Sequence, residues 1–247
     1  MIVYDRNMDQ YELLKSMLDE SRHIVFFTGA GISVPSGIPD FRSSNGLYNQ
    51  KDDSNISPEE IISHSFYTHY KEYFYSFYKS KMVYPNAKPN DAHLYIASLD
   101  DKKDVTVITQ NIDGLHQDAG SKKVIELHGS VKRNYCEKCH KFFDDKYVCS
   151  HEGVPHCDKC GGDIKPDVVL YEESLNEHDI SLAINAIMKA DTMVVIGTSL
   201  VVYPAAGFIR YFRGKHLIVI NKSETNYDSS CDLVIHEDVV KVFNKIK

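Results

Sequence analysis

Four of the six cysteines in this chain of 247 residues form two Cys-x-x-Cys pairs. The pairs are Cys136 with Cys139 and Cys157 with Cys160, and 17 residues separate them. Each pair can present two thiolates to one ion, and this spacing is typical of a four-cysteine zinc ribbon. Because four thiolates close the coordination shell, we expect one structural Zn2+ with no open position for a substrate. The alternative interpretation is a set of free thiols or a redox pair.

Cys149, His140, His151 and His156 lie close to these pairs in the sequence. None of them has the paired spacing, so we leave them out of the predicted zinc site. The N-terminal residues lack the apolar stretch of an export signal, which favours a cytoplasmic location. Disulfides are disfavoured there, so metal binding is the better explanation of the cysteines.

A glycine turn follows the apolar residues 24–27, with the sequence TGAGIS at residues 28–33. Such a turn after a strand can bring backbone N–H groups close to phosphates. The dinucleotide fingerprint requires a further glycine, but Val34 occupies that position. Taken alone, the segment fits a tight turn in an α/β fold as well as it fits a phosphate site.

Polar groups also follow other apolar runs. Residues 37–42 have the sequence GIPDFR, residues 109–113 have TQNID, residues 197–199 have GTS, and Asn221 ends a further run. Any one of these groups could be a cap or a turn residue. Since the carboxyl ends of parallel strands meet at one edge of a sheet, together they predict a nucleotide cleft.

The apolar runs are short, mostly β-branched and bounded by polar residues or glycine, which is typical of buried parallel strands. They cover residues 24–27, 105–108, 124–127, 168–171, 193–196, 217–220 and 233–235. Helical patterns lie between several of them, including residues 91–99, 175–189 and 239–246. This alternation predicts an α/β fold with a Rossmann-like, doubly wound parallel sheet.

Two stretches interrupt the alternation. Residues 58–81 have a helical pattern crowded with Phe and Tyr, and residues 132–165 contain five of the six cysteines but little helix or strand signal. We expect a small lobe made of a helical insertion (41–89) and a zinc ribbon (132–165). The large Rossmann-like lobe then comprises residues 1–40, 90–131 and 166–247, and the cleft between the lobes is the expected active site.

The net charge of −7 argues against nucleic acid as a partner, because phosphate binding needs a basic surface. No apolar run approaches the length needed to cross a bilayer, so we expect no membrane partner. We expect the protein to be a monomer.

At the level of motifs, the chain resembles the sirtuins, the family of NAD-dependent protein deacylases, and specifically a bacterial-type catalytic core. The matching segments are GAGIS (29–33), SGIPDFR (36–42), TQNID (109–113), HGS (128–130), both cysteine pairs, GTSL (197–200) and VIN (219–221). They span nearly the whole sequence, and their combination is far more specific than any single segment.

The resemblance implies that NAD is a co-substrate bound between the lobes. The implied cofactor-binding residues are Gly29, Ala30, Gly31, Ser33, Val34, Asp40, Phe41, Arg42, Gln110, Asn111, Ile112, Asp113, His128, Gly197, Thr198, Ser199, Asn221 and Asp232. By the resemblance, the phosphates and a ribose are approached by Ala30, Ser33 and Val34. The nicotinamide side is lined by Phe41, Arg42 and residues 110–113, and the adenosine half is held by Thr198, Ser199, Asn221 and the region of Cys231 and Asp232.

The implied reaction removes an acyl group from a lysine side chain, with acetyl as the default. NAD loses nicotinamide, the acyl oxygen attacks the freed ribose carbon, and an O-alkylimidate forms. His128 acts as general base on a ribose hydroxyl, a task that suits a group whose pKa lies near neutral pH. Asn111 and Asp113 orient the reactants, and the products are free lysine, nicotinamide and O-acyl-ADP-ribose. The alternative for His128 is a purely structural hydrogen bond at a strand end.

The partner implied by the resemblance is an acylated lysine in a protein or peptide. Val168, Val169, Leu170 and Tyr171 are similar to the strand that pairs with the substrate backbone, although Glu172 follows where the family often has glycine. Tyr75 is the implied contact with the acyl group. Family members that prefer acidic acyl groups carry Tyr-x-x-Arg, but here Tyr78 takes the arginine position, and Lys79 lies about 100° further round a helix. We therefore expect a preference for neutral acyl groups.

Three other functions use the same features. A mono-ADP-ribosyltransferase shares the loss of nicotinamide but needs no base such as His128. A non-enzymatic NAD sensor with a zinc ribbon would not need the full set of polar groups at the strand ends. An NAD-linked oxidoreductase is disfavoured by Val34 in the glycine motif.

Overall fold

The computed structural model describes residues 8–44, 46–49, 56–201 and 204–247. Among these residues the main sheet contains six parallel strands in the order β3-β2-β1-β7-β8-β9. The strands are β1 (His23–Thr28), β2 (Asp104–Thr109), β3 (Val124–Glu126), β7 (Thr192–Ile196), β8 (His216–Ile220) and β9 (Leu233–Ile235). From β1 the chain adds β2 and β3 on one side and then β7, β8 and β9 on the other, as in a doubly wound fold. The predicted fold class is confirmed.

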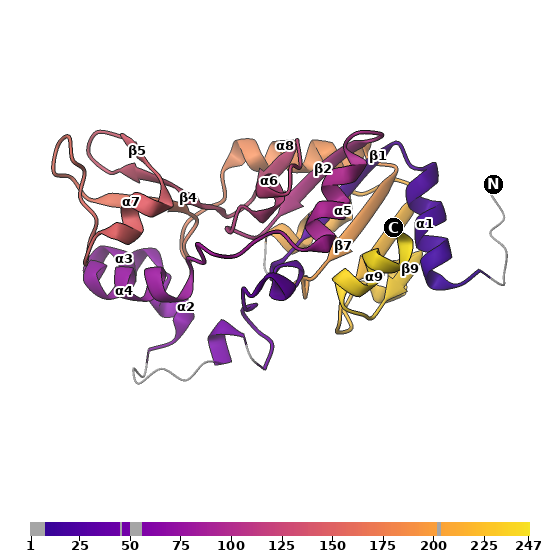
Figure 1. Ribbon diagram of the computed structural model, residues 1–247, viewed down its shortest axis with the longest axis horizontal. Coiled ribbons are helices and arrows are strands. Elements are labelled where there is room, and N and C mark those ends of the chain that lie inside the picture. Colours follow the sequence, from indigo (N-terminus) through magenta and orange to yellow (C-terminus); the bar gives the residue numbers. More distant parts are fainter. Residues whose placement is uncertain (1–7, 45, 50–55, 202–203) are drawn as a thin grey trace.

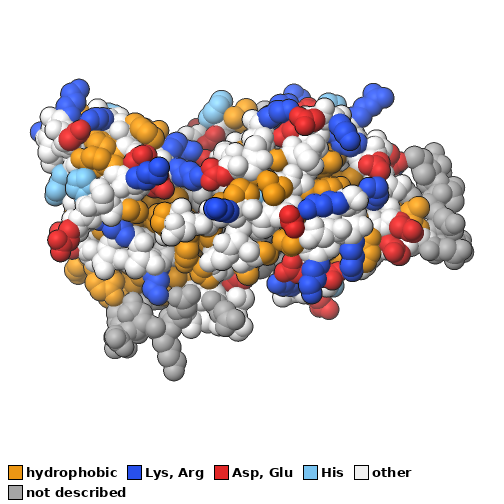
Figure 2. All heavy atoms as spheres, viewed as in Figure 1, with side chains coloured by type: hydrophobic (Ala, Val, Ile, Leu, Met, Phe, Trp, Pro, Cys, Tyr) orange, Lys and Arg blue, Asp and Glu red, His pale blue; other side chains and the backbone are white. Residues whose placement is uncertain are grey.

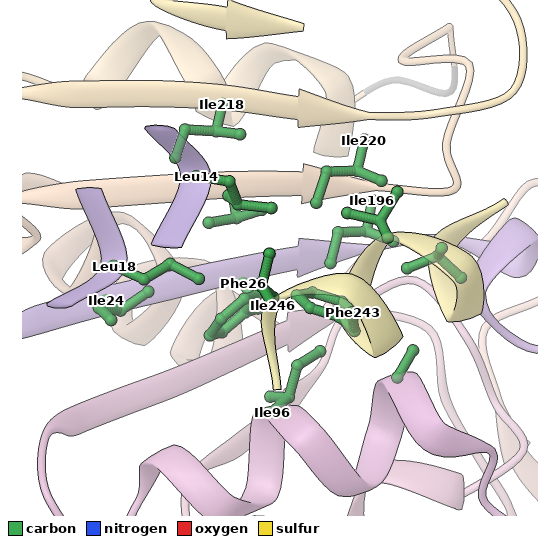
Figure 3. Packing of buried hydrophobic residues seen from close by; sticks show 14 of the residues in the cluster. Leu14, Leu18, Ile24, Phe26, Ile96, Ile196, Ile218, Ile220, Phe243 and Ile246 are labelled. Carbon is green, nitrogen blue, oxygen red and sulfur yellow. The ribbon is translucent and has the colours of Figure 1, made fainter. Parts of the chain in front are cut away.

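Helices cover both faces of this sheet, because the strands are apolar on both sides. In β1, Ile24 and Phe26 face α1 (Gln10–Glu20), α5 (Asp91–Leu99) and α9 (Val239–Ile246), as Figure 3 shows. Val25 and Phe27 face α8 (Glu177–Lys189) and the 3-10 helix η4 (Ala205–Tyr211). The predicted helices 91–99 and 239–246 are therefore observed, and the third begins at Glu177 rather than at residue 175.

The residues assigned to the small lobe lie at one end of the molecule (Figure 1). The helical insertion forms α2 (Pro58–Ile61), α3 (His64–His69) and α4 (Lys71–Lys81). The zinc ribbon forms β4 (Gly129–Cys136), β5 (Phe142–Phe143), α7 (Asp145–Ser150) and β6 (Ile164–Val168), with the strands in an antiparallel sheet of order β5-β4-β6. Both segments contribute to one buried cluster, which includes Phe74, Phe143 and Ile164.

Two expectations about this region are wrong. Residues 168–171 do not form a strand of the parallel sheet, since β6 ends at Val168 and pairs with β4. The ribbon also has more regular structure than its sequence indicates. Its longest strand, β4, has no regular apolar alternation and is fixed by pairing with β5 and β6, so the sequence pattern alone did not reveal it.

Several connections between these elements contain short helices. They are η1 (Ala30–Ile32), η2 (Val34–Ser36), η3 (Leu47–Asn49) and η5 (Asp228–Ser230), and the short helix α6 is Leu115–Asp118. No helix within the described ranges is long and apolar enough to cross a membrane. On the face shown in Figure 2, lysine and arginine side chains are interspersed with acidic ones rather than gathered in one patch.

Candidate active site

The carboxyl ends of β1 and β7 meet at the point where the strand order reverses. The backbone N–H of Gly29 donates to the Ile196 carbonyl at 2.9 Å, and that of Gly31 donates to the Gly197 carbonyl at 2.8 Å. A Cβ added to Gly31 would lie 2.6 Å from Gly197 Cα. The backbones of these two glycines are therefore too close for a side chain at residue 31. This switch point is where doubly wound folds bind ligands, and it contains the predicted glycine turn.

Ser33, Asn111 and Asp113 form a polar network beside this turn. The Ser33 hydroxyl donates to Asp113 Oδ2 at 2.7 Å, and Asn111 Nδ2 donates to Ser33 Oγ at 3.1 Å and to the Gly29 carbonyl at 3.2 Å. Ser33 and Asn111 are buried. The structure thus brings together residues from two distant segments, as predicted.

The Asp113 carboxyl lies mostly in the protein interior. Burial raises its pKa, while the backbone N–H of Leu115 at 2.9 Å and the Ser33 hydroxyl act in the opposite direction by stabilising the carboxylate. Both oxygens of this carboxyl therefore have fixed donors. These two donors hold the carboxyl group in one orientation.

Gln110 connects this network to the next strand end. Its Nε2 donates to Thr198 Oγ1 at 3.1 Å, and its backbone N–H donates to the Thr28 carbonyl at 2.9 Å. Ser199 follows and is exposed, while Asn221 directly follows β8 at the same edge. Of the remaining predicted residues in the turn, Val34 is 36% exposed at the start of η2.

His128 lies between the main sheet and the small lobe. Its Nδ1 is 2.8 Å from the Gln110 carbonyl. A carbonyl can only accept, so Nδ1 is the protonated nitrogen and Nε2 keeps its lone pair. Burial lowers the pKa of His128, and the bond to the Gln110 carbonyl opposes that effect. The ring is therefore a neutral base with one fixed tautomer.

The segment after β6 contacts His128 directly. The backbone N–H of Val169 donates to the His128 carbonyl at 3.0 Å, and that of Tyr171 donates to the Ile62 carbonyl at 3.0 Å. Gly129 makes this approach possible. Its φ is +73°, and a Cβ there would lie 1.9 Å from the Asp167 carbonyl oxygen. The predicted substrate segment thus runs beside the predicted base, although it is not a strand of the main sheet.

The GIPDFR segment forms a loop that reaches the segment after β6 through Tyr48. Asp40 Oδ1 accepts from the backbone N–H groups of Arg42 and Ser43 at 3.1 and 2.8 Å. The Arg42 guanidinium lies 5.4 Å from the ring centre of Tyr48, and Phe41 packs against the same ring. The Tyr48 hydroxyl is 2.7 Å from that of Tyr171. The sequence did not single out Tyr48, which links this loop to the substrate segment.

Tyr75 is not placed as the resemblance implied. Its side chain is 0% exposed within the small-lobe cluster, and its hydroxyl donates to the Ile164 carbonyl. Tyr78 is buried beside it, and Lys79 Nζ donates to the carbonyls of His151 and Gly153, both at 2.6 Å. The packed helix face accounts for these aromatic residues, and Tyr75 is withdrawn as an acyl contact.

Asp232 also differs from its expected position. It precedes β9, and its carboxylate accepts from the backbone N–H of Leu217 at 2.8 Å, near the start of β8. This is the edge of the sheet opposite the glycine turn, so Asp232 cannot hold the adenosine half there. The carboxyl end of β9 leads instead to Asp238, which pairs with Lys222 at 2.9 Å. The apolar pattern predicted strand β9, but Asp232 lies before its amino end and not at the carboxyl end that faces the glycine turn.

The four predicted zinc ligands come together in the ribbon. The sulfur atoms of Cys136, Cys139, Cys157 and Cys160 all lie within 4.8 Å of one another. Sγ of Cys136 is 3.4 Å from that of Cys160, and Sγ of Cys139 is 3.6 Å from that of Cys157. Four thiolates around Zn2+ at their usual bond length lie about 3.8 Å apart, so this arrangement fits a tetrahedral zinc site.

These features define a doubly wound α/β protein with a ligand site at the switch point and a separate zinc ribbon. The Sir2 family model matches residues 29–204. A protein from Clostridium perfringens named NAD-dependent protein deacetylase is 58% identical over 96% of this chain and 98% of its own length. A protein of the same name from Staphylococcus aureus is 48% identical over 95% of this chain and 97% of its own.

Solved structures agree with the sequence comparison. Sir2 with p53 peptide and NAD+ has a TM-score of 0.81 and 42% identity, covering 97% of each chain. A Sir2 variant with deacetylated p53 peptide and 3'-O-acetyl ADP-ribose has a TM-score of 0.85 and 40% identity, covering 96% of this chain and 97% of that one. This chain belongs to the Sir2 family, the sirtuins.

Proposed function

We propose that this protein is an NAD-dependent protein lysine deacetylase. It transfers the acyl group of an acylated lysine to ADP-ribose and releases nicotinamide and O-acyl-ADP-ribose. The observation that carries the proposal is His128, a neutral base of fixed tautomer between the switch point and the segment after β6. The relatives named as NAD-dependent protein deacetylases match this chain over nearly its whole length, which supports the same activity here.

The proposed NAD site comprises the glycine turn, the Ser33–Asn111–Asp113 network and the strand ends at Thr198 and Asn221. The hydroxyl, amide and carboxylate groups found there are the types that hold ribose and amide groups. When NAD is bound, its departing nicotinamide supplies the leaving group that an amide lacks. The fixed donors around Asp113 would hold the reactants in one orientation. The entropy cost of orienting them is then met on binding and does not add to the activation barrier.

His128 supplies the proton transfer in this proposal. Its Nε2 accepts a proton from a ribose hydroxyl, and the Gln110 carbonyl holds the opposite side of the ring. The Asp113 carboxyl has two donors of its own, so it orients rather than exchanges protons. This division of roles supports deacylation over mono-ADP-ribosyl transfer, which needs no such base.

The proposed substrate is an acylated lysine in an extended peptide. Residues 168–171 would lie along this peptide beside His128. Because the N–H groups of Val169, Leu170 and Tyr171 already have acceptors, main-chain pairing with the peptide would fall to the carbonyl groups of the segment. Tyr171 has an exposed side chain there. The Lys79 ammonium is occupied by two carbonyls, which supports a preference for neutral acyl groups, because a buried carboxylate without a cation is costly.

We also propose that the zinc is structural and that the protein acts as a monomer in the cytoplasm. The four cysteines would hold Zn2+ with no open position, so the metal shapes the small lobe without meeting the substrate. A reducing compartment keeps such thiols available for a metal.

The test is to incubate the protein with NAD and one peptide in acetyl and succinyl forms. We expect nicotinamide, O-acetyl-ADP-ribose and free lysine from the acetyl form, with a higher kcat/KM than for the succinyl form. His128→Ala should lower deacetylation by roughly 100- to 10,000-fold while NAD binding largely survives. ADP-ribose attached to protein without deacetylation would instead identify a transferase, and near-normal turnover of His128→Ala would remove His128 from the mechanism.

A further inference from the structure

Arg133 lies where the pairing of β4 with β6 is interrupted. Ser130 pairs with Asp167 and Asn134 pairs with Pro166, so residues 131–133 have no counterparts on β6. From this bulge the Arg133 guanidinium reaches two carboxylates. Its Nη1 donates to Glu126 Oε2, and its Nε donates to Asp167 Oδ2 at 2.8 Å.

The two carboxylates belong to different parts of the fold. Glu126 ends β3 at the edge of the main sheet, opposite Thr109 of β2. Asp167 lies on β6 in the small antiparallel sheet. Arg133 therefore joins the main sheet to the small lobe, at the place where β4 connects them (Figure 1).

Glu126 depends on this contact. Its side chain is 7% exposed, and its Oε1 is buried with no hydrogen-bond partner among the described residues. Asp167 and Arg133 are 44% and 37% exposed. A buried carboxylate is tolerated when it is paired, and the planar guanidinium of an arginine can donate from two of its sides to two acceptors.

Both partners of Arg133 lie close to the reacting groups of the proposed function. Glu126 is two residues before His128, and Asp167 is two residues before Val169. The backbone N–H of Val169 donates to the His128 carbonyl at 3.0 Å. The Arg133 guanidinium therefore binds one residue just before His128 and one residue just before Val169, the two residues whose backbones are in contact.

We infer that Arg133 is a positioning residue that sets the substrate segment relative to His128. The inference rests on the proposed function, since it needs residues 168–171 to hold the acylated peptide. Without Arg133, Glu126 loses its cation and the Asp167 carboxylate loses the donor that connects it to Glu126. The segment after β6 then shifts relative to the base, while the glycine turn and the Ser33–Asn111–Asp113 network keep their contacts.

A merely structural ion pair would behave differently. Its loss would lower the free energy of unfolding and the fraction of active enzyme, which reduces kcat without changing either KM. A positioning role predicts a selective change, in which the KM for the acetyl peptide rises and the KM for NAD does not.

The experiment compares Arg133→Met with the wild-type protein and with Lys141→Met. Lys141 pairs with Asp158 at 2.6 Å within the ribbon and is 41% exposed, so it controls for the loss of an ion pair in the small lobe. For Arg133→Met we expect the peptide KM to rise roughly tenfold and kcat to fall, with the NAD KM within about twofold of wild type. Lys141→Met should change neither KM, and Arg133→Lys should recover only part of the loss.

The double variant Glu126→Gln with Arg133→Met distinguishes an effect on the free energy of unfolding from an effect on the position of the substrate segment. The neutral Gln removes the unpaired charge, so this variant keeps the test valid if Arg133→Met alone does not fold. We expect it to unfold at a denaturant concentration close to that of wild type and to keep the raised peptide KM. A wild-type peptide KM in either folded variant overturns the inference. A wild-type protein that shows no NAD-dependent deacetylation would instead contradict the proposed function.

Discussion

At the scale of single residues, the tautomer of His128 is the most informative feature of the site. The Gln110 carbonyl accepts from Nδ1, which leaves Nε2 as the basic nitrogen. Burial shifts the pKa of the ring below its ordinary value of about 6.5. A base with a lowered pKa is fully deprotonated at neutral pH, so its availability does not limit the reaction there.

The pH dependence of activity follows from this shift. As the proposed base, His128 acts in its neutral form, so kcat/KM should rise with pH with a midpoint below about pH 6.5. The measurement is the pH profile of kcat/KM for the acetyl peptide, restricted to conditions where the protein stays folded. An acidic limb with an apparent pKa clearly above 6.5 would contradict the assignment of His128 as the base.

Residue types and order in the sequence were enough to predict the zinc ligands and the Ser33, Asn111 and Asp113 group. They did not predict which side of an element a residue occupies. Tyr75 belongs to an aromatic helix, and the pattern cannot say whether its hydroxyl meets a ligand or the Ile164 carbonyl. Asp232 was expected beside the adenosine half, but it precedes β9 and its carboxylate meets the start of β8.

At the scale of elements, we expect the zinc ribbon to depend on its metal. Its strand β5 has two residues and its helix α7 has six, which is too little regular structure to fold independently. The strands of the main sheet were predictable because they are continuous apolar runs, whereas β4 has no regular apolar alternation and β6 is only five residues long. The same apolar composition made residues 168–171 look like a main-sheet strand.

Loss of a zinc ligand should therefore unfold the small lobe. Structural zinc supplies about 10–16 kcal/mol of apparent binding free energy in zinc-finger peptides, more than a lobe of this size can replace. Cys136→Ala should lose bound zinc and deacetylase activity, as should treatment of the wild-type protein with a chelator. The measurements are zinc content, circular dichroism and activity.

Cys149→Ala is the matched control, because Cys149 is exposed and outside the four-sulfur cluster. It should keep its zinc and its activity. A stable and active Cys136→Ala protein without zinc would show that the ribbon does not need the metal.

At the scale of the whole molecule, two buried histidines lie beneath the glycine turn. His93 and His116 are 0% and 1% exposed, and their ring centres are 4.8 Å apart. His116 Nε2 is 3.0 Å from Thr28 Oγ1, and His93 Nδ1 accepts from the backbone N–H of Asn90 at 3.3 Å. Burial lowers the pKa of His93 to about 4, and it lowers the pKa of His116 well below its ordinary value.

This pair should make the fold sensitive to acid. In the unfolded chain these histidines bind protons below about pH 6.5, whereas in the folded protein His93 stays neutral down to about pH 4. The free energy of unfolding should therefore be at its full value above pH 6.5 and decrease as pH falls toward 4, with a contribution from His93 of up to about 3 kcal/mol.

Urea unfolding of the wild-type protein and of His93→Gln at pH 7.5 and 5.0 measures this effect. The Gln side chain does not titrate, so the variant should lose less stability between the two pH values. His178→Gln changes an exposed histidine and should behave like wild type. Equal pH dependence in all three proteins would rule out the buried histidine as the cause.

The small lobe has a consequence for how the chain is made. Its buried cluster combines residues 47–83 with residues 131–170, and α5, β2 and β3 are encoded between them. On the ribosome the aromatic helices therefore emerge well before the ribbon that covers them. From Val83, the end of the first segment, to Cys160, the end of the second cysteine pair, translation at about 5–20 residues per second takes roughly 4–15 s. During this time Phe74 and its neighbours are an apolar surface available to chaperones, and the lobe closes only when the second cysteine pair has been synthesised.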